Sequence, residues 1–177
     1  MNYILFDDSR EKLLPLTFTR PVCDLRIGIL TIREKWEAYL NTTTSTLTED
    51  YLTAKFPLTS GSKNVFINGS VCPTAELVAA INSLNEGEGL AKDGKLLAAR
   101  VDVEISSFSK DSEGRNQFGG EILFLENPWD IFSKNGEAIE ADFQLLTVGR
   151  TSAKLSETNA VIGQGKIFLE EGAKAEA

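Results

Sequence analysis

The sequence has no histidine, only two cysteines and no long apolar run, and each absence excludes a class of chemistry. Without histidine, the chain has no Ser-His-Asp or Cys-His nucleophilic centre and no histidine-ligated zinc. Any chemistry must use carboxylates, lysine, arginine, hydroxyl groups and a hard cation such as magnesium. Cys23 and Cys72 stand far apart in no metal-binding spacing, so we expect two buried thiols.

The apolar runs and the charge set the expected location and partners. No run approaches the roughly 20 residues of a membrane-spanning helix. Asp7, Asp8 and Arg10 interrupt the first apolar stretch too early for a signal peptide, so we expect a cytoplasmic protein without membrane contact. The net charge of −8 argues against nucleic-acid binding. Residues 10–35 nevertheless hold six basic and three acidic side chains, which suits a small anionic ligand.

The 177 residues suffice for one domain with its own core, and their periodicity predicts alternating strands and helices. Short apolar runs predict strands at 3–6, 64–68, 95–103 and 121–125. Helical spacing predicts helices at 29–40, from Pro73 to residue 84, and around Ile139, Phe143 and Leu146 up to Gly149. Residues 41–46 and 109–120 are expected loops, and residues 51–56 fit either type. Trp36 and Trp129 are expected to be core or domain-packing residues. This alternation indicates an α/β architecture with a largely parallel sheet.

The tail after residue 150 follows a different pattern. Val161, Ile167 and Ala173 are spaced by six residues, with glycines nearby. This period is typical of a parallel β-helix; the alternative is a terminal β-arm docked on the domain. Because the tail supplies about one coil and a solenoid needs roughly three or more repeats, we expect the chain to be the N-terminal part of something longer.

The loop after the first predicted strand carries the spacing Pro15-Leu16-Thr17-x-x-x-Pro21. This spacing resembles the P-L-T-x-x-x-P-K motif of sugar-phosphate nucleotidyltransferases. The whole chain resembles a divergent bacterial branch of the bifunctional N-acetylglucosamine-1-phosphate uridyltransferase/acetyltransferase family. The resemblance implies a Rossmann-like domain with a mainly parallel sheet over residues 1–150. It also implies a linker and the first coil of a left-handed parallel β-helix over 151–177, with a trimeric full-length form.

The resemblance also implies an enzyme that joins a nucleoside triphosphate to a sugar 1-phosphate and releases pyrophosphate. UTP and N-acetylglucosamine 1-phosphate are the implied substrates. Three departures from the family pattern favour an alternative, a non-catalytic nucleotide-sugar-binding or scaffolding domain of a β-helix acyltransferase. The glycine-rich loop is replaced by residues 7–12, which contain no glycine; the motif lysine is Val22; and the magnesium-binding Gly-Asp pair reads Gly69-Ser70.

The candidate site residues follow two strands, at the sheet edge where phosphorylated ligands bind in open α/β sheets. Arg10 and Arg20 are the expected catalytic cations, which stabilise phosphate charge in the transition state. Asp8 is the expected Mg²⁺ ligand, and Asn135 is a possible second one. The nucleotide and sugar phosphate are expected to contact Asp7, Asp8, Lys12, Thr17, Asn68 and Gly69. The alternatives are solvated strand-end carboxylates, exposed ion pairs and an ordinary strand-to-loop glycine.

Overall fold

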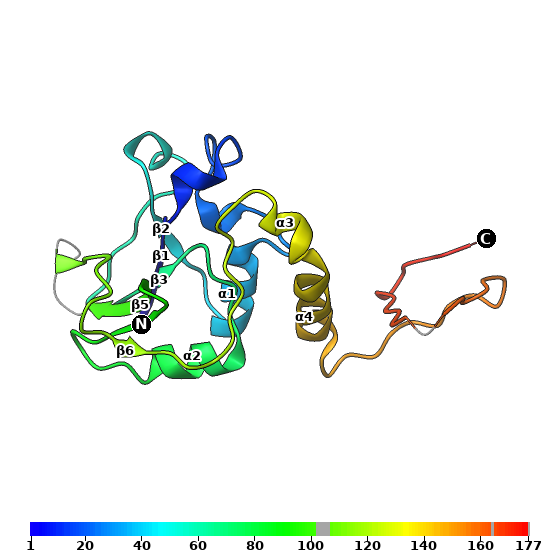
Figure 1. Cartoon of the computed structure of the whole chain (residues 1–177). Coiled ribbons are helices and arrows are strands. Elements are labelled where there is room, and N and C mark those ends of the chain that lie inside the picture. The colour runs from blue at the N-terminus through cyan, green and yellow to red at the C-terminus, as the bar shows by residue number, and fades with distance from the viewer. Residues whose placement is uncertain (102–106, 164, 177) are drawn as a thin grey trace. The chain divides into compact units, whose positions relative to one another are not determined.

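The computed structural model describes residues 1–101, 107–163 and 165–176 (Figure 1). The chain divides into two units, Met1–Asp142 and Phe143–Ala177. The first unit holds the sheet, the core and the candidate site. None of the helices in the described ranges has the length and apolarity needed to cross a membrane.

Six strands within the described residues form one sheet in the order β2-β1-β3-β5-β4-β6. Parallel pairs join β1 to β2, β1 to β3 and β4 to β6, whereas β5 runs antiparallel to β3 and β4. The predicted α/β fold with a mainly parallel sheet is therefore confirmed, with an antiparallel insertion. The strands are β1 (Asn2–Phe6), β2 (Ser45–Leu47), β3 (Asn64–Asn68), β4 (Gly89–Lys92), β5 (Lys95–Val101) and β6 (Asn116–Gln117).

The two central parallel strands bury side chains on both faces, which explains their continuous apolar sequences. Leu5, Val65 and Ile67 belong to the larger core cluster, together with Trp36 from the helical layer. The alternate residues of β1 and β3 form a smaller cluster on the other face, where no helix packs among the described residues: Ile4, Phe6 and Phe66, covered by Phe108 from a loop. The helices are α1 (Ile32–Leu40), α2 (Ala75–Asn82), α3 (Asp130–Ser133) and α4 (Asn135–Thr147).

Helix boundaries follow local capping. The Thr31 side chain accepts a hydrogen bond from the N–H of Glu34, and the Glu34 carboxylate accepts one from the N–H of Thr31. The helix α1 therefore begins at Ile32 rather than at the predicted residue 29. Thr74 caps α2 in the same way through the N–H of Leu77. Pro73 therefore precedes the cap instead of occupying the first turn.

A buried ion pair joins α1 to α4. Lys35 and Asp142 are 4% and 2% exposed and form a short contact between Lys35 Nζ and both carboxylate oxygens. Asp142 Oδ2 also accepts hydrogen bonds from the N–H groups of Ile29 and Leu30, at 2.8 and 3.0 Å. The buried face of α4 therefore includes the charged Asp142. Ile139, which was predicted to lie on an apolar buried face, is 41% exposed.

Several predicted strands and loops differ from the structure, because hydrogen bonding to a neighbouring strand decides whether a segment is a strand. Residues 45–46 and 116–117, predicted as loop, belong to the edge strands β2 and β6 of the sheet. Residues 121–125, predicted as a strand, make only an isolated bridge between Phe124 and Val71. Trp36 lies in the core as predicted, but Trp129 is 65% exposed. Residues 102 and 103 of the strand predicted at 95–103 lie outside the described residues.

The second unit contains no strand within its described residues. The N–H of Ala153 donates to the carbonyl oxygen of Leu169 at 2.9 Å, which brings the two parts of the tail together. Val161 and Ile167, two of the residues spaced by six, are 55% and 51% exposed. The β-helix start is not shown, and both it and the division at residue 150 stay predictions.

Candidate functional site

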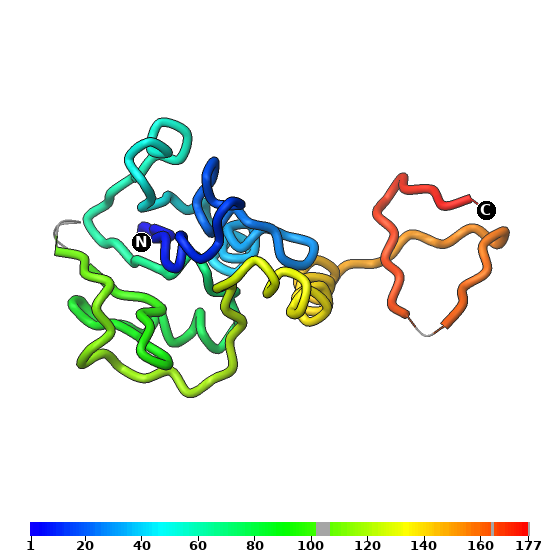
Figure 2. The backbone as a smooth tube through the Cα atoms, turned by 45° about the horizontal axis from the view of Figure 1, so that its top comes forward, coloured from blue at the N-terminus to red at the C-terminus, as the bar shows by residue number. Residues whose placement is uncertain are grey.

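An open pocket of about 530 Å³ lies at the carboxyl end of β1. The loop after β1 and the segment after β2 project from the same edge of the sheet (Figures 1 and 2). This arrangement follows from the register, which places Phe6 opposite both Leu47 and Asn68. The pocket is lined by Asp7, Asp8, Ser9, Arg10, Glu11, Lys12, Leu47, Thr48, Glu49 and Lys110. It therefore collects four of the predicted site residues at the predicted edge.

Asp7 holds the pocket together and is 6% exposed. Its Oδ1 accepts from the N–H of Val22 at 2.7 Å, and its Oδ2 accepts from Thr48 Oγ1 at 2.5 Å and Arg10 Nη1 at 3.2 Å. Its own N–H donates to Leu47 O at 3.0 Å. Both carboxylate oxygens thus bind the protein, so the carboxylate fixes three segments around the end of β1.

Arg10 locks the loop that follows β1, and its side chain is 11% exposed. Besides Asp7, its guanidinium donates to Arg20 O at 3.0 Å, to Thr17 O in a short contact, and to Tyr51 Oη at 2.6 Å. The buried Thr17 returns a hydrogen bond from its Oγ1 to Arg10 O at 2.9 Å. Arg10 and Thr17 are therefore brought together as partners within the loop.

The remaining predicted cations have different surroundings. Arg20 is exposed and does not line the pocket, and its guanidinium makes no hydrogen bond or ion pair within the described ranges. Lys12 is exposed and lines the pocket. A third cation, Lys110, was missed by the sequence analysis, and its Nζ donates to Asp7 O at 2.7 Å. No local motif reveals this residue because it reaches the site from a distant part of the chain.

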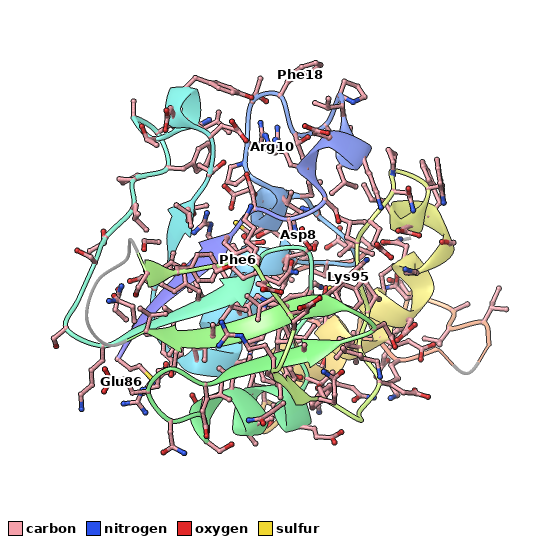
Figure 3. All side chains as sticks on the ribbon, turned by 60° about the vertical axis from the view of Figure 1, so that its left-hand side comes forward. Phe6, Asp8, Arg10, Phe18, Glu86 and Lys95 are labelled. Carbon is pink, nitrogen blue, oxygen red and sulfur yellow. The ribbon has the colours of Figure 1, made fainter. Side chains whose placement is uncertain are left out.

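Unlike the buried Asp7, Asp8 is a pocket carboxylate that a ligand can reach. It is half-buried, and its Oδ2 accepts from Asn68 Nδ2 at 3.0 Å. Asn68 is fully buried and is itself fixed by Leu96 O at 2.9 Å and by Ser70 Oγ at 2.6 Å. Figure 3 shows Asp8 beyond the end of β1, between the sheet and the Arg10 side chain. The predicted pairing of the two strand ends at one edge is thus present.

Gly69 lies away from the pocket, packed against β1. Its N–H donates to Phe6 O at 2.9 Å, and a Cβ added there would lie 3.0 Å from the same oxygen and 3.3 Å from Cys23 Cβ. This close approach favours glycine, because a Cβ would need the neighbouring atoms to shift by a few tenths of an ångström. Asn135, the possible second metal ligand, instead accepts from the N–H of Gly28 at 2.8 Å.

A magnesium ion fits Asp8 only in combination with a ligand. No group of three acidic or cysteine residues within the described ranges is arranged to hold a metal. Mg²⁺ keeps several waters and is usually bound through one or two carboxylates plus substrate phosphates. Asp8 retains an oxygen without a hydrogen bond among the described residues and faces an open pocket, so the donor set suits a phosphate-bound Mg²⁺.

Both cysteines are buried thiols, as predicted. Burial raises the pKa of Cys23 far above its usual range and raises the pKa of Cys72 to about 12. Because the thiolate is the reactive form, neither side chain supplies a nucleophile.

We expect Arg10→Ala to lower the free energy of unfolding by about 3 kcal/mol, because it leaves the buried Asp7 carboxylate without its cation. Arg20→Ala, seated in the same loop, is expected to change it by no more than about 0.5 kcal/mol. Urea unfolding of both variants measures the difference. Equal effects of the two substitutions would contradict the anchoring role of Arg10.

Comparison with known proteins agrees with this geometry. A family model described as sugar nucleotidyl transferase matches residues 3–151, which include every residue that lines the pocket and all described strand residues except Asn2, the first of β1. No curated protein matches the chain. Since the matched span covers most of the sequence, the chain belongs to the sugar nucleotidyl transferase family.

Proposed function

We propose that the protein transfers a nucleotidyl group from a nucleoside triphosphate to a sugar 1-phosphate, at the pocket after β1. The observation that carries this proposal is the meeting of Asp8, oriented by Asn68, with Lys12 and Lys110 in one open pocket. A carboxylate beside two lysine ammonium groups suits a triphosphate that binds together with a divalent cation. The family membership supplies the reaction class.

The residues divide between building the site and serving the ligand. Asp7, Arg10 and Thr17 hold the loop, so that the pocket is already formed before the ligand binds. Lys12 and Lys110 place positive charge beside the phosphates, where it stabilises the charge that develops on the leaving pyrophosphate. Asp8 would hold Mg²⁺, which when bound neutralises phosphate charge and makes the α-phosphorus more electrophilic.

Direct displacement is the economical chemistry. A phosphate oxygen of the sugar 1-phosphate attacks the α-phosphorus in line; the new P–O bond forms as the bond to pyrophosphate breaks. Both cysteines are buried and protonated, so the thiols of the chain do not offer a covalent alternative. The resemblance to the uridyltransferase branch makes UTP and N-acetylglucosamine 1-phosphate the first pair to test. A cytoplasmic location and a trimer of a longer form remain expectations from the sequence.

One observation favours the non-catalytic alternative. The magnesium-binding aspartate that the family resemblance implies is replaced by Ser70, which is buried and donates its hydroxyl to Asn68 Oδ1 at 2.6 Å. A protein that binds a nucleotide sugar without turnover needs only the pocket. The two functions therefore differ in whether pyrophosphate is released.

The experiment mixes the whole chain with UTP, N-acetylglucosamine 1-phosphate and magnesium, and converts any pyrophosphate to phosphate with inorganic pyrophosphatase. A second panel uses TTP and glucose 1-phosphate. We expect phosphate release that requires both substrates. Omission of the sugar phosphate controls for simple hydrolysis of the triphosphate. Binding of a nucleotide sugar by calorimetry without turnover of either pair would support the scaffolding alternative instead.

A further inference from the structure

Lys110 occupies a special place in the pocket, because it comes from neither the loop after β1 nor the segment after β2. Its Nζ donates to Asp7 O at 2.7 Å, so the ammonium lies at the end of β1. The sequence around it carries no recognisable motif. We propose that Lys110 binds a phosphate group of the substrate in this pocket; the inference rests on the proposed function and assigns a phosphate-binding residue to it.

Neither arginine of the loop after β1 is placed to meet a phosphate in the pocket. The guanidinium of Arg10 is committed to Asp7, to two carbonyl oxygens and to Tyr51, and its side chain is 11% exposed. Arg20 does not line the pocket. Using Arg10 for phosphate would require breaking the bonds that hold the loop. That leaves the two lysines as the cations that a ligand in the pocket can meet.

Lys110 has unused capacity for an anion. An ammonium group has three donors, and one of them is used by Asp7 O. Within the described ranges no carboxylate forms an ion pair with Lys110, although Asp7, Asp8, Glu11 and Glu49 line the same pocket. A lysine that faces a pocket and holds a main-chain oxygen, with its charge unpaired, is suited to charge-assisted hydrogen bonds from Nζ to phosphate oxygens.

The position of Lys110 is set by an aromatic anchor two residues earlier. The Phe108 ring stacks on Phe66 with centroids 4.0 Å apart and packs against Phe6 at 5.1 Å. Lys110 Nζ itself lies 5.9 Å from the centroid of Phe6. The rings therefore fix the segment to the second face of the sheet, and Lys110 is placed at the pocket by the fold rather than by a freely moving loop.

The phosphate belongs either to the nucleoside triphosphate or to the sugar 1-phosphate, and calorimetry with each ligand separates the two. We compare the wild type with Lys110→Met, Lys110→Arg and the control Lys63→Met, which removes an exposed lysine outside the pocket. Titrations use UTP with magnesium and N-acetylglucosamine 1-phosphate alone. We expect Lys110→Met to weaken one of them by about 10- to 100-fold, the cost of a lost charged hydrogen bond. Lys110→Arg should restore part of the affinity, and Lys63→Met should match the wild type.

Thermal unfolding and steady-state kinetics complete the test. We expect Lys110→Met to keep the wild-type melting temperature and to raise KM for the ligand whose affinity falls. If the wild type binds these ligands and Lys110→Met binds them equally well, the inference is overturned while the proposed function stands. If the wild type binds neither ligand, the proposed function fails and the assignment of Lys110 fails with it.

Discussion

Replacing Asp142 by alanine is expected to lower the free energy of unfolding by about 3–5 kcal/mol, the usual cost of removing one partner of a buried ion pair. Lys35 is 4% exposed and would keep its charge in the core without a counter-ion. The N–H groups of Ile29 and Leu30 would lose their acceptor at the same time. Urea unfolding followed by circular dichroism measures the change.

Two further variants show whether the pair itself is the cause. Glu140→Ala changes an exposed carboxylate on the same helix and is expected to stay within about 0.5 kcal/mol of the wild type. The double variant Lys35→Met/Asp142→Leu removes both charges, and we expect it to be more stable than Asp142→Ala because no buried charge remains unpaired. A loss below about 1 kcal/mol in Asp142→Ala would contradict the buried ion pair.

The second large effect concerns the adjacent aspartates at the end of β1. Asp8→Asn is expected to lower kcat by about 10²–10³, the cost of removing one preorganised electrostatic group. Its stability should change little, since Asp8 is half-buried and an asparagine oxygen can still accept from Asn68 Nδ2. The coupled phosphate assay and a thermal melt measure the two properties on the same sample.

Asp7→Asn serves as the matched control, with the opposite expected result. Both oxygens of Asp7 accept hydrogen bonds, so an amide group would point N–H donors at other donors. We expect the free energy of unfolding to fall by about 3 kcal/mol, and kcat to fall as well because the loop is distorted. If Asp8→Asn keeps more than a tenth of the wild-type kcat, the division of roles between the two residues is wrong.

The loop after β1 is held in place without any glycine between residues 7 and 12. In place of a glycine-rich turn, one carboxylate and one guanidinium tie the loop to the end of the strand. Arg10 alone spans the chain from Asp7 to Thr17 and Arg20. Side-chain hydrogen bonds thus hold the loop, and the guanidinium of Arg10 is occupied by these bonds.

The parts of the fold that local pattern decides could be predicted from the sequence. β1 and β3 were found because strands buried on both faces read as continuous apolar runs. β2 and β6 were missed because each is a short, largely polar edge strand that exists through its neighbour's hydrogen bonds. The helix α4 was predicted, but its buried face was not. Asp142 is buried because it forms an ion pair with Lys35 of α1, and the sequence does not show this long-range contact.

The candidate site divides in the same way. Asp8 and Asn68 were predictable because they end parallel strands that share an edge. The hydrogen bonds of Arg10 could not be predicted, because every residue has a main-chain carbonyl oxygen and the sequence does not show which one accepts. Lys110 depends on the packing of Phe108 against two strands, which no spacing reveals. Long-range contacts therefore account for what the sequence reading missed.

The measurement that tests the proposed reaction most directly is its reverse. The whole chain is incubated with UDP-N-acetylglucosamine, labelled pyrophosphate and magnesium, in parallel with a panel of other nucleotide sugars, and nucleoside triphosphates are then separated. Direct displacement at the pocket predicts that label enters the triphosphate only when a nucleotide sugar is present, and that Asp8→Asn abolishes most of it. Absence of label with every nucleotide sugar, in protein that binds one of them, would contradict a catalytic site after β1.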